Sequence, residues 1–269
     1  MQIAFWSTVH GQTTTTTNSV AIACAIALEY KMKTLITHSH FEKSTLEASM
    51  VDKLFLNTGL TELKDNGIDA LSRLVKFSTL DNERILSYTT TLLKGRLDLL
   101  VGTKNTNKAL YLSDFNNMIV TILNAIKRQY DLLIVDVPAG DSEINQKILD
   151  NSDIIVINLN QNINILEDFF KKDYPKFLHK CMFLISMYDE SSSLGIRNLQ
   201  RRYKVKDNIG CIPYCRAFAD ACNDGKAIDF FVKNIRAEKN DLYYTFINEV
   251  RKSVISLFNQ LDIDSKRGD

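Results

Sequence analysis

The sequence predicts an α/β fold of three layers, in which one doubly wound, mostly parallel sheet of seven or eight strands lies between helices. Short apolar runs alternate with helical patterns along the chain, as they do in βαβ units. The clearest strand, 131–136, is the β-branched and leucine-rich kind of segment that occupies the centre of a parallel sheet. With 269 residues, 45% of them hydrophobic, the chain can bury one full core.

The expected elements follow in order. The apolar run 3–6 predicts a buried strand, and the small apolar residues 19–28 predict a buried helix after it. A second strand is expected at 33–37, and residues 43–96 are expected to be polar and mostly helical, with a helix at 68–75. Further strands are expected at 97–102, 131–136, 153–159, 182–187 and 208–212, and further helices at 115–130 and 241–261.

No linker or repeat divides the sequence, so we expect one domain over residues 1–261 and a frayed polar tail over 262–269. The 33 Lys and Arg nearly balance the 32 Asp and Glu, so the overall charge does not favour binding to nucleic acid. Only a local basic patch could bind it. Without a membrane-length apolar run or the features of a signal peptide, the protein is expected to be cytoplasmic. The five cysteines show no paired spacing and are expected to be reduced and mostly buried.

A polar turn and a run of threonines separate the first strand from the first helix. Strand, tight turn and helix is the layout of a phosphate-binding loop, in which amides at the helix N-terminus hold phosphate. The turn resembles the loop of the ParA/MinD family of P-loop ATPases, Gly-Lys-Gly-Gly-Val-Gly-Lys-Thr-Thr. When that loop is laid on residues 6–14, Gly11, Thr13 and Thr14 match, and Gln12 replaces the phosphate-binding Lys. The resemblance implies a phosphate site at His10, Gly11, Gln12, Thr13 and Thr14, with Thr13 on Mg²⁺.

The segment Asp136-Val137-Pro138-Ala139-Gly140 follows the predicted central strand, and its spacing resembles the MinD branch of the same family. The resemblance implies that Asp136 belongs to the Mg²⁺ shell and that Gly140 senses the γ-phosphate of ATP. The alternative is a strand-end Asp that caps the next helix.

His38-Ser39-His40 stands where the family has Asp-x-Asp, so the resemblance puts His40 at the position of the water-orienting Asp. A neutral imidazole does not supply that negative charge beside Mg²⁺. Together with Gln12, two charges that matter for phosphoryl transfer are missing, which points away from efficient hydrolysis. His10, His38 and His40 also suggest a metal site, but no Cys or carboxylate accompanies them at ligand spacing.

Two late strand ends complete the resemblance. In relatives these regions flank adenine, which implies a base site at Ser186, Pro213 and Tyr214, with Ser186 in place of the adenine-reading Asn. A plain strand-end turn is the alternative. The apolar stripe of the last helix carries few basic residues, so we expect a core helix, and membrane binding is not expected.

The resemblance implies a nucleotide-binding protein that takes ATP and Mg²⁺, forms a homodimer and serves as a positioning or assembly factor with a protein partner, hydrolysing slowly or not at all. A local patch leaves DNA open as a partner. The alternative is a pseudo-ATPase interaction module that binds no nucleotide. A small-molecule kinase on the same fold would need catalytic charges that the sequence does not contain.

Overall fold

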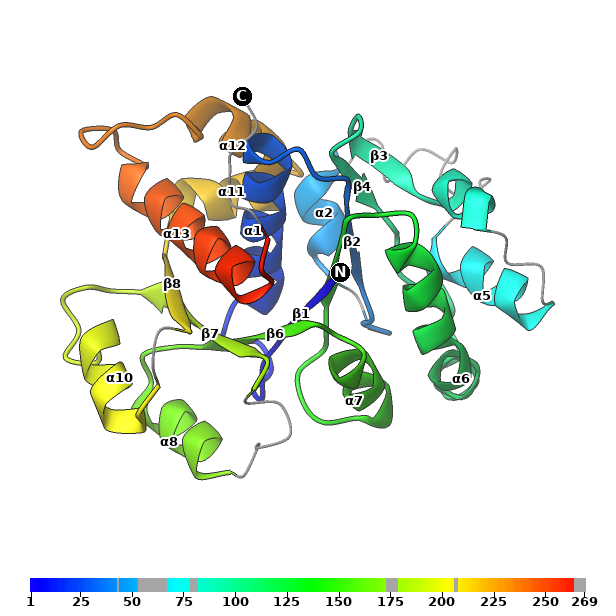
Figure 1. Cartoon of the computed structure of the whole chain (residues 1–269), viewed down its shortest axis with the longest axis horizontal. Coiled ribbons are helices and arrows are strands. Elements are labelled where there is room, and N and C mark those ends of the chain that lie inside the picture. Colours follow the sequence, from blue (N-terminus) through cyan, green and yellow to red (C-terminus); the bar gives the residue numbers. More distant parts are fainter. Residues whose placement is uncertain (43, 53–66, 78–81, 173–178, 206–207, 264–269) are drawn as a thin grey trace.

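An eight-stranded sheet runs through the protein in the order β3-β4-β2-β5-β1-β6-β7-β8 (Figure 1). The computed structural model describes residues 1–42, 44–52, 67–77, 82–172, 179–205 and 208–263. The strands are β1 Gln2–Trp6, β2 Thr34–His38, β3 Thr90–Leu93, β4 Leu97–Leu99, β5 Leu132–Asp136, β6 Ile154–Leu159, β7 Cys181–Tyr188 and β8 Ile209–Pro213. The predicted three-layer α/β fold with one mostly parallel sheet is confirmed.

Helices cover both faces of this sheet. The described helices are α1 Thr15–Glu29, α2 Leu46–Met50, α5 Ile68–Lys76, α6 Lys108–Lys127, α7 Glu143–Asp150, α8 Ile163–Lys171, α10 Ile196–Tyr203, α11 Arg216–Asn223, α12 Ala227–Asn234 and α13 Tyr244–Gln260, with a 3₁₀ helix η1 at Asn82–Tyr88. One core cluster joins the sheet to α1, α2 and α11–α13, and the other joins it to α5–α8 and α10. Successive residues of β1 alternate between the two clusters, as the period of a strand requires.

Parallel pairing places the ends of three strands together. β5 lies between β2 and β1, and Asp136 at its end is in register with Phe5 of β1 and His38 of β2. All neighbouring pairs are parallel except β3 with β4. The loops that follow β1, β2 and β5 therefore meet at one edge of the sheet, where ligands of open α/β folds bind.

Two predicted elements differ from the structure. Residues 90–93, expected within a helical stretch, form the edge strand β3, because a tight turn at Gly95 (φ 70°) folds them back against β4. Helix α6 begins at Lys108 and not at 115, since Ser113 and Asp114 are residue types that favour a helix N-cap and suggested a start after them. The parts of the expected helical stretch at 53–66 and 78–81 lie outside the described residues, as do residues 264–269 of the expected tail.

Helix α13 packs as a core helix, as predicted. Its stripe of Phe246, Val250, Val254, Leu257 and Phe258 is buried. Gly210 of β8 lets the helix approach, because a Cβ there would lie 2.7 Å from Ser253 Oγ. Across the ranges that the structure describes, no helix is both long and apolar enough to cross a membrane. All five cysteines are free thiols and four are buried, which confirms that prediction.

Candidate functional site

The turn after β1 leads into α1 without a side-chain cap. Gly11 (φ 71°) and Thr14 (φ 45°) adopt left-handed backbone conformations, and α1 begins at Thr15. No side chain caps the helix at Thr14, and its first turn carries no acidic residue. The first amides of a helix have no partner within it and form the positive end of its dipole. The N-terminus of α1 is therefore suited to an anion such as phosphate.

A cavity of about 310 Å³ opens beside this helix end. It is lined by residues of the turn and of α1, by residues after β2 and by residues after β5: Val9, His10, Gly11, Thr13, Thr14, Thr15, Thr16, Thr17, His40, Ser44, Thr45, Val137 and Ala139. The structure thus brings together five of the predicted site residues. Gln12 does not line the cavity: its side chain is exposed, and its carbonyl oxygen accepts a hydrogen bond from Asn160 Nδ2 at 2.9 Å.

Asp136 lies fully buried at the end of β5, where α1 reaches it. Thr16 Oγ1 donates a hydrogen bond to Asp136 Oδ2 at 2.7 Å. Thr13, the residue predicted to stand beside Asp136 on the metal, instead places its hydroxyl 3.2 Å from Thr15 Oγ1. Sequence reasoning missed Thr16 because five consecutive threonines leave the position of the helix start ambiguous.

Buried polar atoms without partners gather at this edge. Within the described parts of the chain, Thr8 Oγ1, Ser39 Oγ, His40 Nε2 and Asp136 Oδ1 are buried and have no hydrogen-bond partner. His40 Nε2 lies 3.3 Å from Asp136 Oδ2 but is not aligned for a hydrogen bond. Unpaired buried polar atoms cost free energy unless a ligand or ion satisfies them. A carboxylate beside hydroxyl groups is a donor set that fits Mg²⁺.

The other histidine of the pair has a structural role. His38 Nε2 lies 2.7 Å from Glu47 Oε1, and its Nδ1 accepts a hydrogen bond from the His40 amide at 3.1 Å. Glu47 also accepts from the Gly102 amide at 2.9 Å. Burial acts to raise the pKa of Glu47, but the hydrogen bonds from His38 and Gly102 outweigh it and lower that pKa.

A side chain at position 102 would collide with the imidazole, since a Cβ there would lie 2.2 Å from His38 Cε1. His38 therefore packs between Gly102 and Glu47. Among the described residues, no three His, Cys, Asp or Glu side chains are grouped so as to hold a metal ion, so the three-histidine site finds no support there.

The predicted base residues fall at different depths. Ser186 is fully buried, and its Oγ accepts a hydrogen bond from Asn18 Nδ2 at 2.8 Å. The same Asn18 amide donates to Asn158 Oδ1 at 2.8 Å, so these three residues tie α1 to β6 and β7. Ser186 does not line the cavity beside Pro213 and Tyr214, whereas its neighbour Met187 does, and the placement of Ser186 in a base site stays a prediction.

Pro213 and Tyr214 do line a cavity, a small one of about 80 Å³ on the other side of α1. Tyr214 is 66% exposed. Thr14 and Thr17 line this cavity as well as the 310 Å³ cavity. The two hollows therefore meet at the N-terminus of α1.

Gly140 has a left-handed backbone (φ 93°), and its backbone groups are already engaged. Its amide donates to the carbonyl oxygen of Ser7 at 3.2 Å, and its own carbonyl oxygen accepts from Trp6 Nε1 at 2.8 Å and Asn145 Nδ2 at 2.9 Å. Ala139, and not Gly140, lines the 310 Å³ cavity. The predicted role of Gly140 at the γ-phosphate therefore requires these bonds to change.

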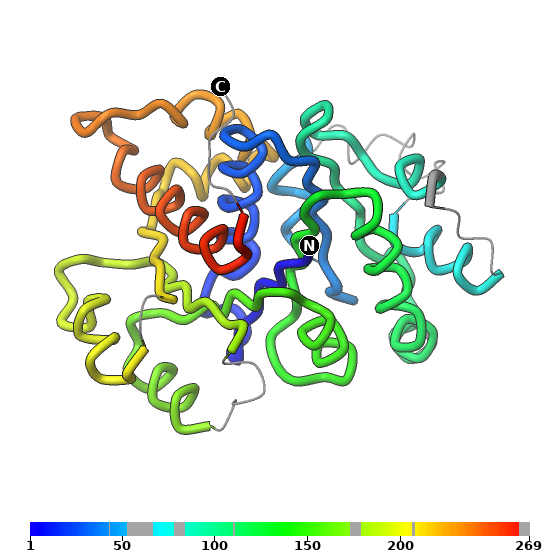
Figure 2. The backbone as a smooth tube through the Cα atoms, in the orientation of Figure 1, coloured from blue at the N-terminus to red at the C-terminus, as the bar shows by residue number. Residues whose placement is uncertain are grey.

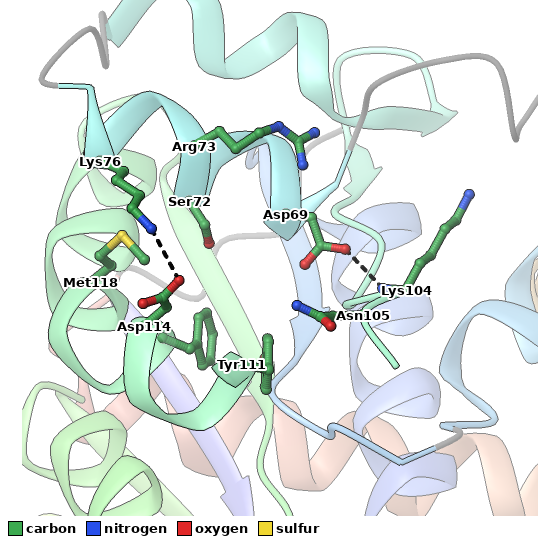
Figure 3. A pocket seen from close by; sticks show the side chains of 10 residues that line it. Asp69, Ser72, Arg73, Lys76, Lys104, Asn105, Tyr111, Asp114 and Met118 are labelled. Carbon is green, nitrogen blue, oxygen red and sulfur yellow. Dashed lines mark hydrogen bonds and ion pairs between the residues drawn. The ribbon is translucent and has the colours of Figure 1, made fainter. Parts of the chain in front are cut away.

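A third cavity, of about 340 Å³, lies apart from these two, between α5 and α6 (Figure 3). Its charged side chains engage partners nearby: Lys76 Nζ lies 3.3 Å from Asp114 Oδ2, and Asp69 accepts from the Lys104 amide at 2.8 Å. None of the site residues predicted from the sequence lines it.

No protein-family model matches the sequence, and no curated protein matches it. Solved structures do match the fold. A ParA family ATPase from Chlorobium tepidum superposes with a TM-score of 0.73 at 13% identity, covering 94% of this chain and 98% of its own. The septum site-determining protein MinD from Pyrococcus horikoshii, complexed with Mg-ADP, gives 0.64 at 15% identity, covering 97% and 96%.

A putative plasmid partition protein from Borrelia burgdorferi, bound to AMPPNP, gives a TM-score of 0.62 at 17% identity, covering 97% of this chain and 98% of its own. At these identities the likeness concerns the fold, and it extends over nearly the whole of each chain. The chain has the P-loop NTPase-like αβα fold of the ParA/MinD ATPases and partition proteins.

Proposed function

We propose that this chain is a ParA/MinD-like nucleotide-binding protein that takes ATP with Mg²⁺ and hydrolyses it slowly or not at all. One observation carries the proposal: the uncapped N-terminus of α1 lies between two cavities that share Thr14 and Thr17. A nucleotide laid across this helix end has its phosphates at the 310 Å³ cavity and its base at Pro213 and Tyr214. The Mg-ADP and AMPPNP in structures with the same fold support this choice of ligand.

The residues divide between phosphate and metal. The amides of the turn and the first helical turn, with His10, Gly11, Thr13 and Thr14 on the cavity wall, hold the phosphates. Asp136 and the hydroxyl of Thr16 hold Mg²⁺, which offsets the charge of the phosphates when it is bound.

Slow hydrolysis follows from the charges around the cavity. Among the described residues that line it there is no Lys or Arg. His40 lies on its wall where a water-orienting carboxylate is expected from the resemblance. Loss of one preorganised transition-state charge or donor costs on the order of 10²–10³ in rate. Steady-state turnover is therefore expected to be near background, and multiple turnovers per minute from a pure preparation would contradict it.

With nucleotide bound, the protein acts as a homodimeric positioning or assembly factor for a protein partner in partition, conjugation or localisation of a surface machine. This part of the proposal is supported by the shared fold alone. The second candidate is an interaction module that has kept the fold and binds no nucleotide, and the exposed Gln12 in place of a lysine favours it.

A titration with a fluorescent ATP analogue, with and without Mg²⁺, separates the two candidates. The wild type is expected to bind weakly and saturably, with Mg²⁺ tightening the complex. Asp136→Asn should lose the Mg²⁺ effect, whereas Asp141→Asn, an exposed carboxylate on the following loop, should keep it. Absence of a saturable signal at millimolar concentration would establish the interaction module instead.

A second test restores the missing charge. Gln12→Lys is expected to lower the dissociation constant for ATP about tenfold or more, because a hydrogen bond to a charged group adds roughly 1.5–3 kcal/mol. Gln12→Met, which has similar length and no charge, is the control. If the lysine variant folds normally and binds no better, a charge at position 12 does not reach the phosphates, in keeping with the exposed side chain of Gln12.

A further inference from the structure

A groove of about 830 Å³ lies at the edge of the sheet formed by β8. Helices α10 and α13 stand on either side of this strand (Figures 1 and 2). Because α10 belongs to one helical layer and α13 to the other, the groove follows the gap between the layers along the sheet edge. Cys211 and Pro213 of β8 line it.

The walls of the groove carry more positive than negative charge that is open to a ligand. Arg197 and Arg201 of α10 and Lys252 of α13 line it, together with Glu190 and Glu249. Glu249 Oε1 pairs with Lys252 Nζ at 2.6 Å, and Glu249 also accepts a hydrogen bond from Cys211 Sγ at 3.4 Å. Arg197 and Arg201 therefore stand against the exposed Glu190 as the charges that remain open to a ligand.

Arg197 is exposed and, within the described ranges, makes no hydrogen bond or ion pair. Among the residues that the structure describes, Arg201 donates only to a neutral partner, Asn198 Oδ1, at 2.7 Å. No acidic residue lies on α10 to offset these charges. In a protein whose net charge is +1, this cluster is a local basic patch.

The shape of the groove favours a polypeptide. A sheet edge flanked by two helices accommodates an extended chain, and such edges recur as peptide sites.

We propose that the groove between α10 and α13 binds an extended, acidic segment of a partner protein. The carboxylates of the segment pair with Arg197 and Arg201, and its backbone lies along β8. Pro213 lines both this groove and the 80 Å³ cavity, so the segment ends beside the nucleotide site. The groove and its charges do not depend on whether that site binds nucleotide.

Fluorescence anisotropy with the full chain tests the proposal. The probe is a fluorescein-labelled peptide of alternating Glu and Val, compared with a Lys-Val peptide and with duplex DNA. Saturable binding of the acidic peptide, weakened by salt, is expected, without binding of the basic peptide. The double variant Arg197→Gln/Arg201→Gln should weaken it about fivefold or more, since each exposed ion pair contributes modestly.

Arg202→Gln is the matched control, because Arg202 lies on the same helix, pairs with Glu167 at 2.7 Å and does not line the groove. It should change the affinity by less than about twofold. If Arg202→Gln and the double variant lose the same affinity for the acidic peptide, the peptide binds a general basic surface and the proposed groove is wrong. If DNA binds more tightly than the acidic peptide and is equally weakened by the loss of Arg197 and Arg201, the groove binds nucleic acid and the proposed polypeptide ligand is wrong.

Discussion

Removing the hydroxyl of Thr16 tests which threonine hydroxyl is needed beside Asp136 for the effect of Mg²⁺ on nucleotide binding. Thr16→Val keeps the shape and branching of the side chain and removes only the donor to Asp136 Oδ2. Thr13→Val makes the same change three residues earlier, in the turn before α1, where the hydroxyl lies beside Thr15 Oγ1. The two variants therefore differ in which hydrogen bond they remove and not in chemistry.

The expected magnitudes follow from the two contacts. The Thr16 bond is short, 2.7 Å, and reaches a carboxylate with no exposed area, so its loss should cost about 1.5–3 kcal/mol of unfolding free energy. In a chain of this size that corresponds to a fall of roughly 3–5 °C in Tm. The Thr13 contact joins two neutral hydroxyls at 3.2 Å, and its loss should cost about 0.5–1.5 kcal/mol.

Urea unfolding without Mg²⁺ gives the stability of both variants, and nucleotide titration with and without Mg²⁺ gives their function. Thr16→Val should lose stability and the Mg²⁺ effect together, and its stability loss should shrink in an Asp136→Asn background because the two groups interact directly. The reasoning is refuted if Thr13→Val loses the Mg²⁺ effect and Thr16→Val keeps it.

Three further outcomes are expected. Burial raises the pKa of Glu47, but the hydrogen bonds from His38 and Gly102 outweigh it and lower that pKa, so the stabilisation by Glu47 is complete above its unfolded pKa of about 4.5 and is lost as pH falls through the folded value. Glu47→Gln should therefore make the urea midpoint depend less on pH between about pH 5 and pH 3. An unchanged pH dependence would contradict this. Asn18→Ala leaves buried acceptors on Asn158 and Ser186 without their donor and should cost roughly 2–5 kcal/mol in urea unfolding, whereas a loss below about 0.5 kcal/mol would show that the network is dispensable. His40→Asp, in the Gln12→Lys background, should raise ATP turnover measured by phosphate release, and no change would remove His40 from the hydrolytic site.

The sequence by itself determined the sheet and the place of the site within it. Apolar runs such as Ile3–Trp6 and Leu132–Asp136 are continuous because parallel strands are covered on both faces, so composition alone identifies them. Polar residues at the ends of these runs marked the turn after β1 and the loop after β5. Their convergence at one edge then follows from parallel pairing.

Only the tertiary structure decided which side chains meet at this edge. Five consecutive threonines are equivalent in any local pattern, and Thr16 was selected by how α1 packs against the end of β5. Ser186 is buried and accepts a hydrogen bond from Asn18, which lies 168 residues away in the chain. The edge strand β3 and the groove beside β8 likewise arise from contacts between separate elements. Local periodicity records which residues are buried, whereas hydrogen-bond partners and cavities depend on which distant segments meet.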